Sequence, residues 1–133
     1  FGAEESGLNG SKALVADLKS RGALPAYMVN LDVTGIGGRV EVIGTGPASQ
    51  VALRLAKEAG IEAVPSRLPP NSGSDHQSFA DAGVETVYFT SGDFSTIHSP
   101  EDVAAAIDQA MLDRIGDSAL LTVRALLEEV AAG

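Results

Sequence analysis

Short apolar runs alternate with amphipathic stretches along this 133-residue chain, and that alternation constrains the fold more than any other feature. Ala26–Val33 is mostly apolar and is bounded by Pro25 and Gly35, as expected for a strand buried in a sheet. Val40–Ile43 and Glu85–Thr90 are further runs of the same kind. Strands that alternate with helices favour helical layers packed on a largely parallel sheet. The sequence therefore predicts an α/β fold, a three-layer sandwich around a largely parallel central sheet.

Helical periodicity and helix-end signals occupy the segments between these runs. The expected helices cover Ser11–Arg21, Ala48–Ala59, a short segment from Ser74 to Ala82, and Asp117–Ala132, with Leu120, Leu126, Leu127 and Val130 among the apolar positions of the last. Pro65–Gly73 is expected to be a loop, and Phe1–Ala3 the end of a buried strand whose earlier part lies outside the chain.

A further helix is predicted to begin at Ser99 and to run to about Ile115. Ser99 would be the cap residue, Pro100 the first helical residue and Asp102 the acidic residue of a capping box. This sequence is a strong local signal for a helix start.

The composition indicates one folded domain, residues 1–133, and excludes several classes of function. Hydrophobic residues make up 44% of the chain and charged residues 20%, which suits a packed globular protein. A net charge of −9 repels phosphate backbones and anionic lipids, so nucleic acid and membrane surfaces are not expected partners. The chain has no cysteine, which excludes thiolate metal sites and cysteine nucleophiles.

Carboxylates and an imidazole follow the ends of the apolar segments. Glu4 and Glu5 come after the first, Asp32 ends the second, and His98 closes the loop after the third. Sites in open α/β sheets collect at the carboxyl ends of strands, so these side chains should converge. Glu5, Asp32 and His98 are donors of the kind that binds zinc, and Glu4 would be free to take a proton from a water. Taken singly, each also suits an ordinary solvated or capping role.

Two further polar positions have a structural and a functional interpretation. Asp75 would cap the helix that it precedes, or Asp75 and His76 would lie behind a metal ligand or near a substrate. Asp102 would serve the capping box or hold the loop that carries His98. The glycine-rich stretches 35–38 and 44–47 lack the residues of a phosphate-binding loop or a dinucleotide fingerprint, so nucleotide binding is not expected.

Four ordered motifs resemble the second half of the co-catalytic zinc aminopeptidase family. They are FGAEESGLNGS, NLDVTG, SGSDHQSF followed by AGVETVYF, and IHSPED. The family includes secreted bacterial leucine-type aminopeptidases and is related to glutamate carboxypeptidase and glutaminyl cyclase. The resemblance implies the C-terminal portion of a zinc-peptidase-like catalytic domain whose N-terminal strands are missing from this chain.

The resemblance also implies an activity and the residues that perform it. The family removes N-terminal amino acids from peptides with a free N-terminus and uses two zinc ions. Glu4 matches the general base, which takes the proton of the attacking water and delivers it to the leaving amine. Glu5 and His98 match ligands of one zinc, and Asp32 matches a ligand of the other. A secreted or periplasmic location is favoured on the same ground.

This chain departs from the family pattern at several positions. A histidine and a bridging aspartate that bind zinc in the family lie upstream of the Glu-Glu pair, where this chain has only Phe1, Gly2 and Ala3. A tyrosine often found before the last histidine is Ile97 here. With these ligands missing, one zinc or none is expected on this chain alone.

Three explanations of the short length remain open. The chain is a piece of a longer aminopeptidase, or a shortened protein whose remaining ligands hold one zinc, with a second copy completing the site. The third is a non-catalytic module that forms homo-oligomers through an exposed sheet edge. A glutaminyl cyclase-like acyltransferase is a further alternative, disfavoured because that family uses tryptophans around its pocket and this chain has none.

Overall fold

The computed structural model describes residues 1–44 and 46–133, and within them four strands form one mixed sheet. The strands are β1 (Tyr27–Leu31), β2 (Val40–Ile43), β3 (Ala63–Ser66) and β4 (Glu85–Thr90), in the spatial order β1-β4-β2-β3. β1 pairs with β4 and β2 with β3 in parallel, whereas β2 and β4 are antiparallel. Most of the pairing is therefore parallel.

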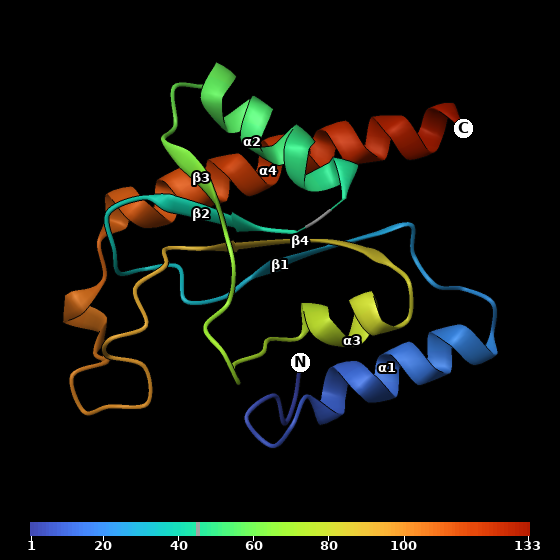
Figure 1. Ribbon diagram of the computed structural model, residues 1–133, viewed down its shortest axis with the longest axis horizontal. Coiled ribbons are helices and arrows are strands. Elements are labelled where there is room, and N and C mark those ends of the chain that lie inside the picture. Colours follow the sequence, from blue (N-terminus) through green and yellow to red (C-terminus); the bar gives the residue numbers. More distant parts are fainter. Residues whose placement is uncertain (45) are drawn as a thin grey trace.

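Helices cover both faces of this sheet (Figure 1). α2 (Pro47–Glu58) and α4 (Gln109–Ala132) pack together on one face, and α1 (Asn9–Ser20) and α3 (His76–Asp81) pack together on the other. A short 3₁₀ turn, Ala104–Ala106, precedes α4. The arrangement confirms the predicted α/β three-layer sandwich.

The main hydrophobic core lies between the sheet and the α2–α4 layer. Val87 and Phe89 of β4 contribute to it, together with Met111 and Ile115 of α4, and all four are buried. Tyr88 lies between Val87 and Phe89 and therefore points to the opposite face, where its ring contacts His76 of α3. A smaller core of Val15, Phe79 and Val84 holds α1 and α3 to the sheet.

The structure corrects the predicted start of the last helix. α4 begins after Asp108, whose Oδ1 accepts a 2.9 Å hydrogen bond from the backbone N–H of Ala110. The Ser99 hydroxyl accepts only from the N–H of Glu101, at 3.2 Å, within a turn. Residues 101–110 are all exposed, so a helix there would bury no apolar face, and packing rather than a cap stabilises most helices.

α4 also differs from the prediction in its length and its buried face. It runs unbroken through Gly116 to Ala132, where two helices were predicted. Of the residues predicted on the apolar side, Leu120, Leu127 and Val130 are exposed, whereas Leu126 is buried. The buried positions are Met111, Ile115, Ser118, Ala119, Thr122 and Leu126.

Two segments outside the helices also differ from the prediction. Pro65–Gly73 was predicted to be a loop, but its first residues, Pro65 and Ser66, belong to β3. This strand, Ala63–Ser66, pairs with β2. Phe1–Ala3 is not a strand: Phe1 is exposed, and the backbone N–H groups of Gly7 and Leu8 donate to the Glu4 carbonyl at 3.0 and 2.8 Å to form a turn. This segment is not part of the sheet that the described strands form.

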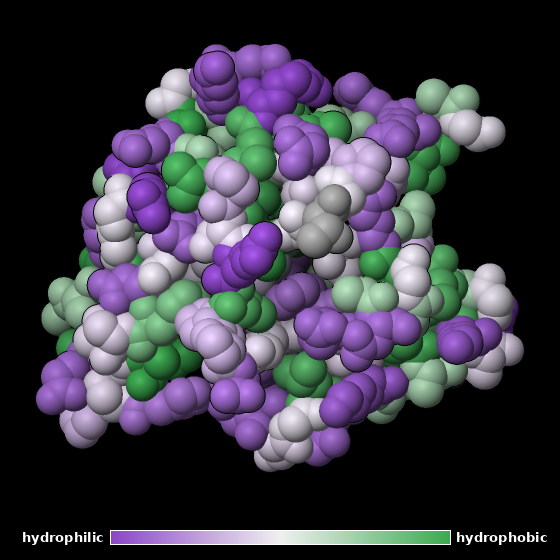
Figure 2. Space-filling view, viewed as in Figure 1, coloured by the Kyte–Doolittle hydropathy of each residue, from purple (hydrophilic) through white to green (hydrophobic). Residues whose placement is uncertain are grey.

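The surface mixes polar and apolar side chains. Figure 2 shows hydrophobic residues in small groups between hydrophilic ones on the face presented there. Among the helices of the described residues, none has the length and apolar character needed to cross a membrane.

Candidate functional site

A cavity of about 590 Å³ at the carboxyl ends of β1 and β4 contains four of the residues singled out in the sequence. Glu4, Glu5, Asp32 and His98 all line it, although they come from three distant segments. Its remaining wall is largely apolar and includes Leu8, Val33, Leu68, Pro69, Tyr88, Phe94 and Ile97. A neighbouring cavity of about 430 Å³ shares Glu5, Asp32 and His98 and includes Asp102.

The sheet topology explains why these segments meet. Asp32 follows β1 and His98 lies in the loop after β4, and the two strands are parallel neighbours. The carboxyl ends of parallel neighbours lie at the same edge of a sheet. Glu4 and Glu5 reach this edge from the turn before α1.

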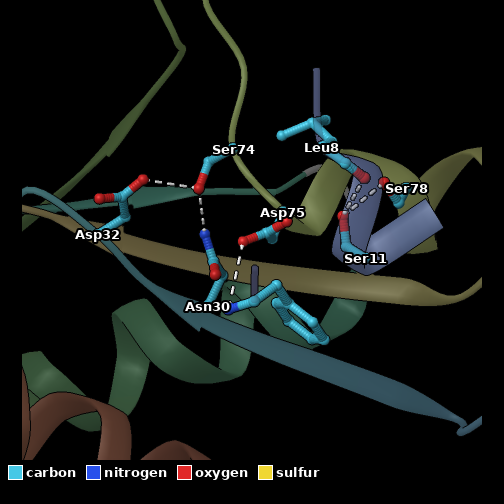
Figure 3. A network of polar contacts seen from close by, with 8 residues as sticks. Leu8, Ser11, Asn30, Asp32, Ser74, Asp75 and Ser78 are labelled. Carbon is cyan, nitrogen blue, oxygen red and sulfur yellow. Dashed lines mark hydrogen bonds and ion pairs between the residues drawn. The ribbon is translucent and has the colours of Figure 1, made fainter. Parts of the chain in front are cut away.

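Two buried residues hold the carboxylate of Asp32 (Figure 3). The Ser74 hydroxyl donates to Asp32 Oδ2 at 2.8 Å, and Asn30 Nδ2 donates to the Ser74 hydroxyl at 2.8 Å. Ser74 and Asn30 are only 2% and 9% exposed. The relay fixes the direction of the Asp32 carboxylate before any ligand arrives.

Glu5 and His98 form a pair at the mouth of the cavity. Glu5 Oε2 lies 3.3 Å from His98 Nε2, and their side chains are 70% and 61% exposed. A carboxylate and an imidazole at this spacing fit two positions of a zinc site, which normally has three or four protein ligands. Within residues 1–44 and 46–133 no three His, Cys, Asp or Glu side chains converge closely enough to hold a metal ion. The described residues therefore provide part of a zinc site.

Burial and neighbouring carboxylates raise the pKa of Glu4. Burial is the largest cause, followed by the charges of Glu5, Asp32 and Asp75, while His98 acts in the opposite direction. A carboxylate with a raised pKa is better matched to exchanging protons near neutral pH than an ordinary one. This property suits a general base.

Asp75 lines an adjoining cavity that shares Glu4, Glu5 and Asp32 with the first, and His76 follows it in the chain. They are 7% and 6% exposed, and Asp75 Oδ1 and His76 Nδ1 are buried without a hydrogen-bond partner in the part of the chain that the structure describes. The His76 ring packs on Tyr88 with 4.8 Å between ring centres. Burial lowers the pKa of His76, against the smaller opposite effects of Asp32 and Asp75.

The capping roles weighed for Asp75 and Asp102 are not seen among the described residues. Asp75 precedes α3, but its side chain caps no N–H group of that helix. Asp102 is exposed beside the smaller cavity, and its backbone N–H donates to the Ser99 carbonyl at 3.2 Å. Asp102 thus belongs to the turn that follows His98.

Backbone strain gathers around the same cavity. Of the described residues other than glycine, five have a positive φ of 52° to 63°, and each lines the cavity or adjoins a residue that lines it: Ala3, Leu8, Val33, Asn71 and His98. Side chains disfavour this conformation, which persists only where surrounding contacts impose it and which clusters at functional sites.

Sequence reasoning missed the residues that support Asp32. Asn30 interrupts an apolar strand, and a polar side chain in such a run requires a buried partner, which was an available signal. Ser74 lies in a loop rich in serine and glycine and carries no comparable signal.

Solved structures with the same fold include aminopeptidases and a glutaminyl cyclase. The LapA aminopeptidase of Legionella pneumophila is 19% identical, with a TM-score of 0.82 over 92% of this chain and 36% of that one. A zinc aminopeptidase from Bacillus subtilis is 27% identical, with a TM-score of 0.80 over 92% of this chain and 34% of that one. An Acidobacteriales bacterium glutaminyl cyclase is 20% identical, with a TM-score of 0.70 over 92% of this chain and 46% of that one.

The chain spans about a third of the length of the two aminopeptidases. No curated protein matches the sequence. The family model of peptidase family M28 matches residues 1–123, which include Glu4, Glu5, Asp32 and His98. On this match over nearly the whole sequence, the chain belongs to peptidase family M28.

Proposed function

We propose that this chain is the C-terminal portion of the catalytic domain of a zinc-dependent aminopeptidase, which hydrolyses the N-terminal residues of peptides. The observation that carries the proposal is the convergence of Glu4, Glu5, Asp32 and His98 on one cavity. Membership of peptidase family M28 and the 27% identity to a zinc aminopeptidase support it.

In this proposal Glu5 and His98 hold one zinc ion and Asp32 contributes to a second. A bound zinc would lower the pKa of a water and polarise the peptide carbonyl. Because no group of three donors converges among the described residues, the chain by itself holds at most one zinc, and Asp32, which lines the same cavity as the Glu5–His98 pair, would then serve as a ligand of that ion. The remaining ligands would come from a segment of a longer protein or from a second copy.

The other residues would transfer a proton, hold the metal ligand Asp32 in place or contact the substrate. Glu4, whose pKa is raised, accepts a proton from the attacking water and passes it to the leaving amine. Asp32 is fixed by Ser74. The apolar wall that includes Leu68 and Phe94 would accept an apolar N-terminal side chain. Ile97 leaves no phenolic donor at the position before His98.

Zinc titration by calorimetry at neutral pH tests the metal site. Zinc should bind to the chain, and Glu5→Ala and His98→Ala should each abolish binding, whereas Glu128→Ala, an exposed glutamate on α4, should leave it unchanged. Binding that survives both substitutions, or no saturable binding at all, would contradict the proposal that this chain holds zinc.

Product analysis tests the reaction. The protein with a complete zinc site should release free leucine from leucyl peptides. The Glu4→Gln variant should lose this activity and should still bind zinc. A glutaminyl cyclase would instead form a pyroglutamyl peptide and ammonia from a glutaminyl peptide. Release of these products would replace the aminopeptidase proposal with the cyclase.

A non-catalytic module that forms homo-oligomers is the second candidate. β1 is one of the two edge strands of the described sheet, and Leu31 at its end is 49% exposed. Unpaired edges invite pairing with another chain. Analytical ultracentrifugation showing a stable oligomer, together with no effect of zinc on any activity, would favour this candidate. A secreted or periplasmic location is also part of the main proposal, and fractionation of the producing cells tests it.

A further inference from the structure

We propose that Thr90 and Ser91 are positioning residues for Asp32. They donate hydrogen bonds to the carbonyl oxygen of Val33. These bonds hold Val33, the residue directly after Asp32, in a left-handed backbone conformation at the cavity. The functional part of this inference rests on the role proposed above for Asp32 as a metal ligand.

Val33 is the strained position in this arrangement. Its φ is 52°, in the left-handed region, although it is a β-branched residue. A side chain branched at Cβ is a genuine outlier there, and such strain persists only when surrounding contacts impose it. The contacts that impose it should therefore be visible around Val33.

Those contacts come from the end of β4. The Val33 carbonyl accepts hydrogen bonds from the Ser91 N–H at 2.9 Å, the Ser91 hydroxyl at 2.7 Å and the Thr90 hydroxyl at 3.0 Å. Thr90 is fully buried and Ser91 is 3% exposed, so water has little access to compete for the carbonyl. We call these three hydrogen bonds the Val33 clamp.

Asp32 is consequently fixed on two sides. Ser74 holds its carboxylate, and the clamp holds the peptide group that follows it. The Asp32 N–H donates to the Phe89 carbonyl at 3.3 Å, which continues the pairing of β1 with β4 by one residue before the chain turns away at Val33. Without the clamp, Val33 would relax towards an extended conformation and carry Asp32 with it.

Gly37 packs closely against the backbone of Ser91, one of the two residues of the clamp. Its φ is 131°, and a Cβ atom there would lie only 2.5 Å from the Ser91 carbonyl oxygen. The loop around Gly37 thus packs directly against the Ser91 backbone. This contact restricts the movement of Ser91 away from Val33.

The double variant Thr90→Val with Ser91→Ala removes both hydroxyl groups of the clamp with little change in volume. Its matched control is Ser118→Ala with Thr122→Val, because those buried hydroxyls also donate to carbonyls, at 2.8 Å, but inside α4. The first measurement is the intraresidue amide–Hα NOE of Val33 by NMR, which is strong at positive φ. It should weaken in the clamp variant and persist in the control.

The second measurement is zinc affinity by calorimetry. Groups that orient metal ligands typically change affinity by about 10- to 100-fold, and a loss of this size is expected for the clamp variant and not for the control. Adding Val33→Gly to the clamp variant should restore affinity, because glycine adopts positive φ without strain. Thr90→Ser retains a hydroxyl and should behave as the unaltered chain.

A clamp variant that keeps both the Val33 NOE and the zinc affinity would overturn the inference. If the clamp variant does not fold, Thr90→Val alone gives the same two measurements with one hydroxyl removed. If the unaltered chain fails to bind zinc, the proposal that this chain by itself holds zinc fails, and the NOE still decides whether Thr90 and Ser91 hold Val33.

Discussion

The Ser74 hydroxyl donates a 2.8 Å hydrogen bond to Oδ2 of Asp32, a residue 42 positions earlier in the chain. The same hydroxyl accepts from Asn30 Nδ2 at 2.8 Å, so one buried oxygen joins β1 to the loop before α3. We therefore expect the loss of this hydroxyl to disturb both ends of the link.

Replacing Ser74 by alanine should affect both stability and the metal site. The buried Asn30 amide loses its acceptor, which should lower the free energy of unfolding by about 1–3 kcal/mol in a urea titration. Zinc affinity should fall by about tenfold or more because the Asp32 carboxylate is no longer oriented. Ser72→Ala is the control, since that exposed hydroxyl bonds only to the Pro69 carbonyl among the described residues. Equal behaviour of the two variants would refute the role of Ser74.

His76 should make the fold less stable in acid. Its pKa is lowered from 6.5, chiefly by burial, so the folded state favours the neutral ring and the unfolded state takes up the proton first as the pH falls. The His76 contribution is fully present above the unfolded pKa of 6.5 and declines as the pH falls from there towards the lower folded pKa. Urea titrations from about pH 8 to about pH 5 should show the unaltered chain losing more stability than His76→Phe. Parallel curves would contradict this assignment.

Gly37 and Gly38 provide a matched pair for backbone strain. Gly37→Ala places a Cβ against the Ser91 backbone at a φ of 131° and should cost about 1–3 kcal/mol of unfolding free energy. At Gly38 a Cβ meets no described atom within 4 Å, so Gly38→Ala should change stability by less than about 0.5 kcal/mol. Thermal and urea unfolding of both variants measure the difference. A harmless Gly37→Ala would show that this loop does not press on Ser91.

Leu126 and Leu127 test which face of α4 is buried. Leu126 is 4% exposed in the main core, and Leu126→Ala should lower the unfolding free energy by about 2–5 kcal/mol. Leu127 is 63% exposed, and Leu127→Ala should change it by less than about 0.5 kcal/mol. The reverse order of the two effects would mean that α4 presents the other face to the sheet.

Much of the fold could be predicted from the sequence because its signals are local. The apolar runs before Asp32 and after Val84 are bounded by proline and glycine, and they became β1 and β4 within about two residues at each end. β3 was missed because Ala63–Ser66 is short, contains Pro65 and is only partly buried. The signal at Ser99 was real but local, and the exposed residues after it gave a helix nothing to pack against.

Several features of this protein can be read directly from its residues: carboxylates and an imidazole after the apolar segments, no thiol, and the motifs of a peptidase family. How those groups are held in place depends on long-range contacts in the folded chain. Pairing of β1 with β4 joins residues more than fifty positions apart and brings Val33, the residue after Asp32, against Thr90 and Ser91. Such contacts depend on which strands become neighbours, and that choice follows from burying the whole core, which is not encoded near any one of these residues.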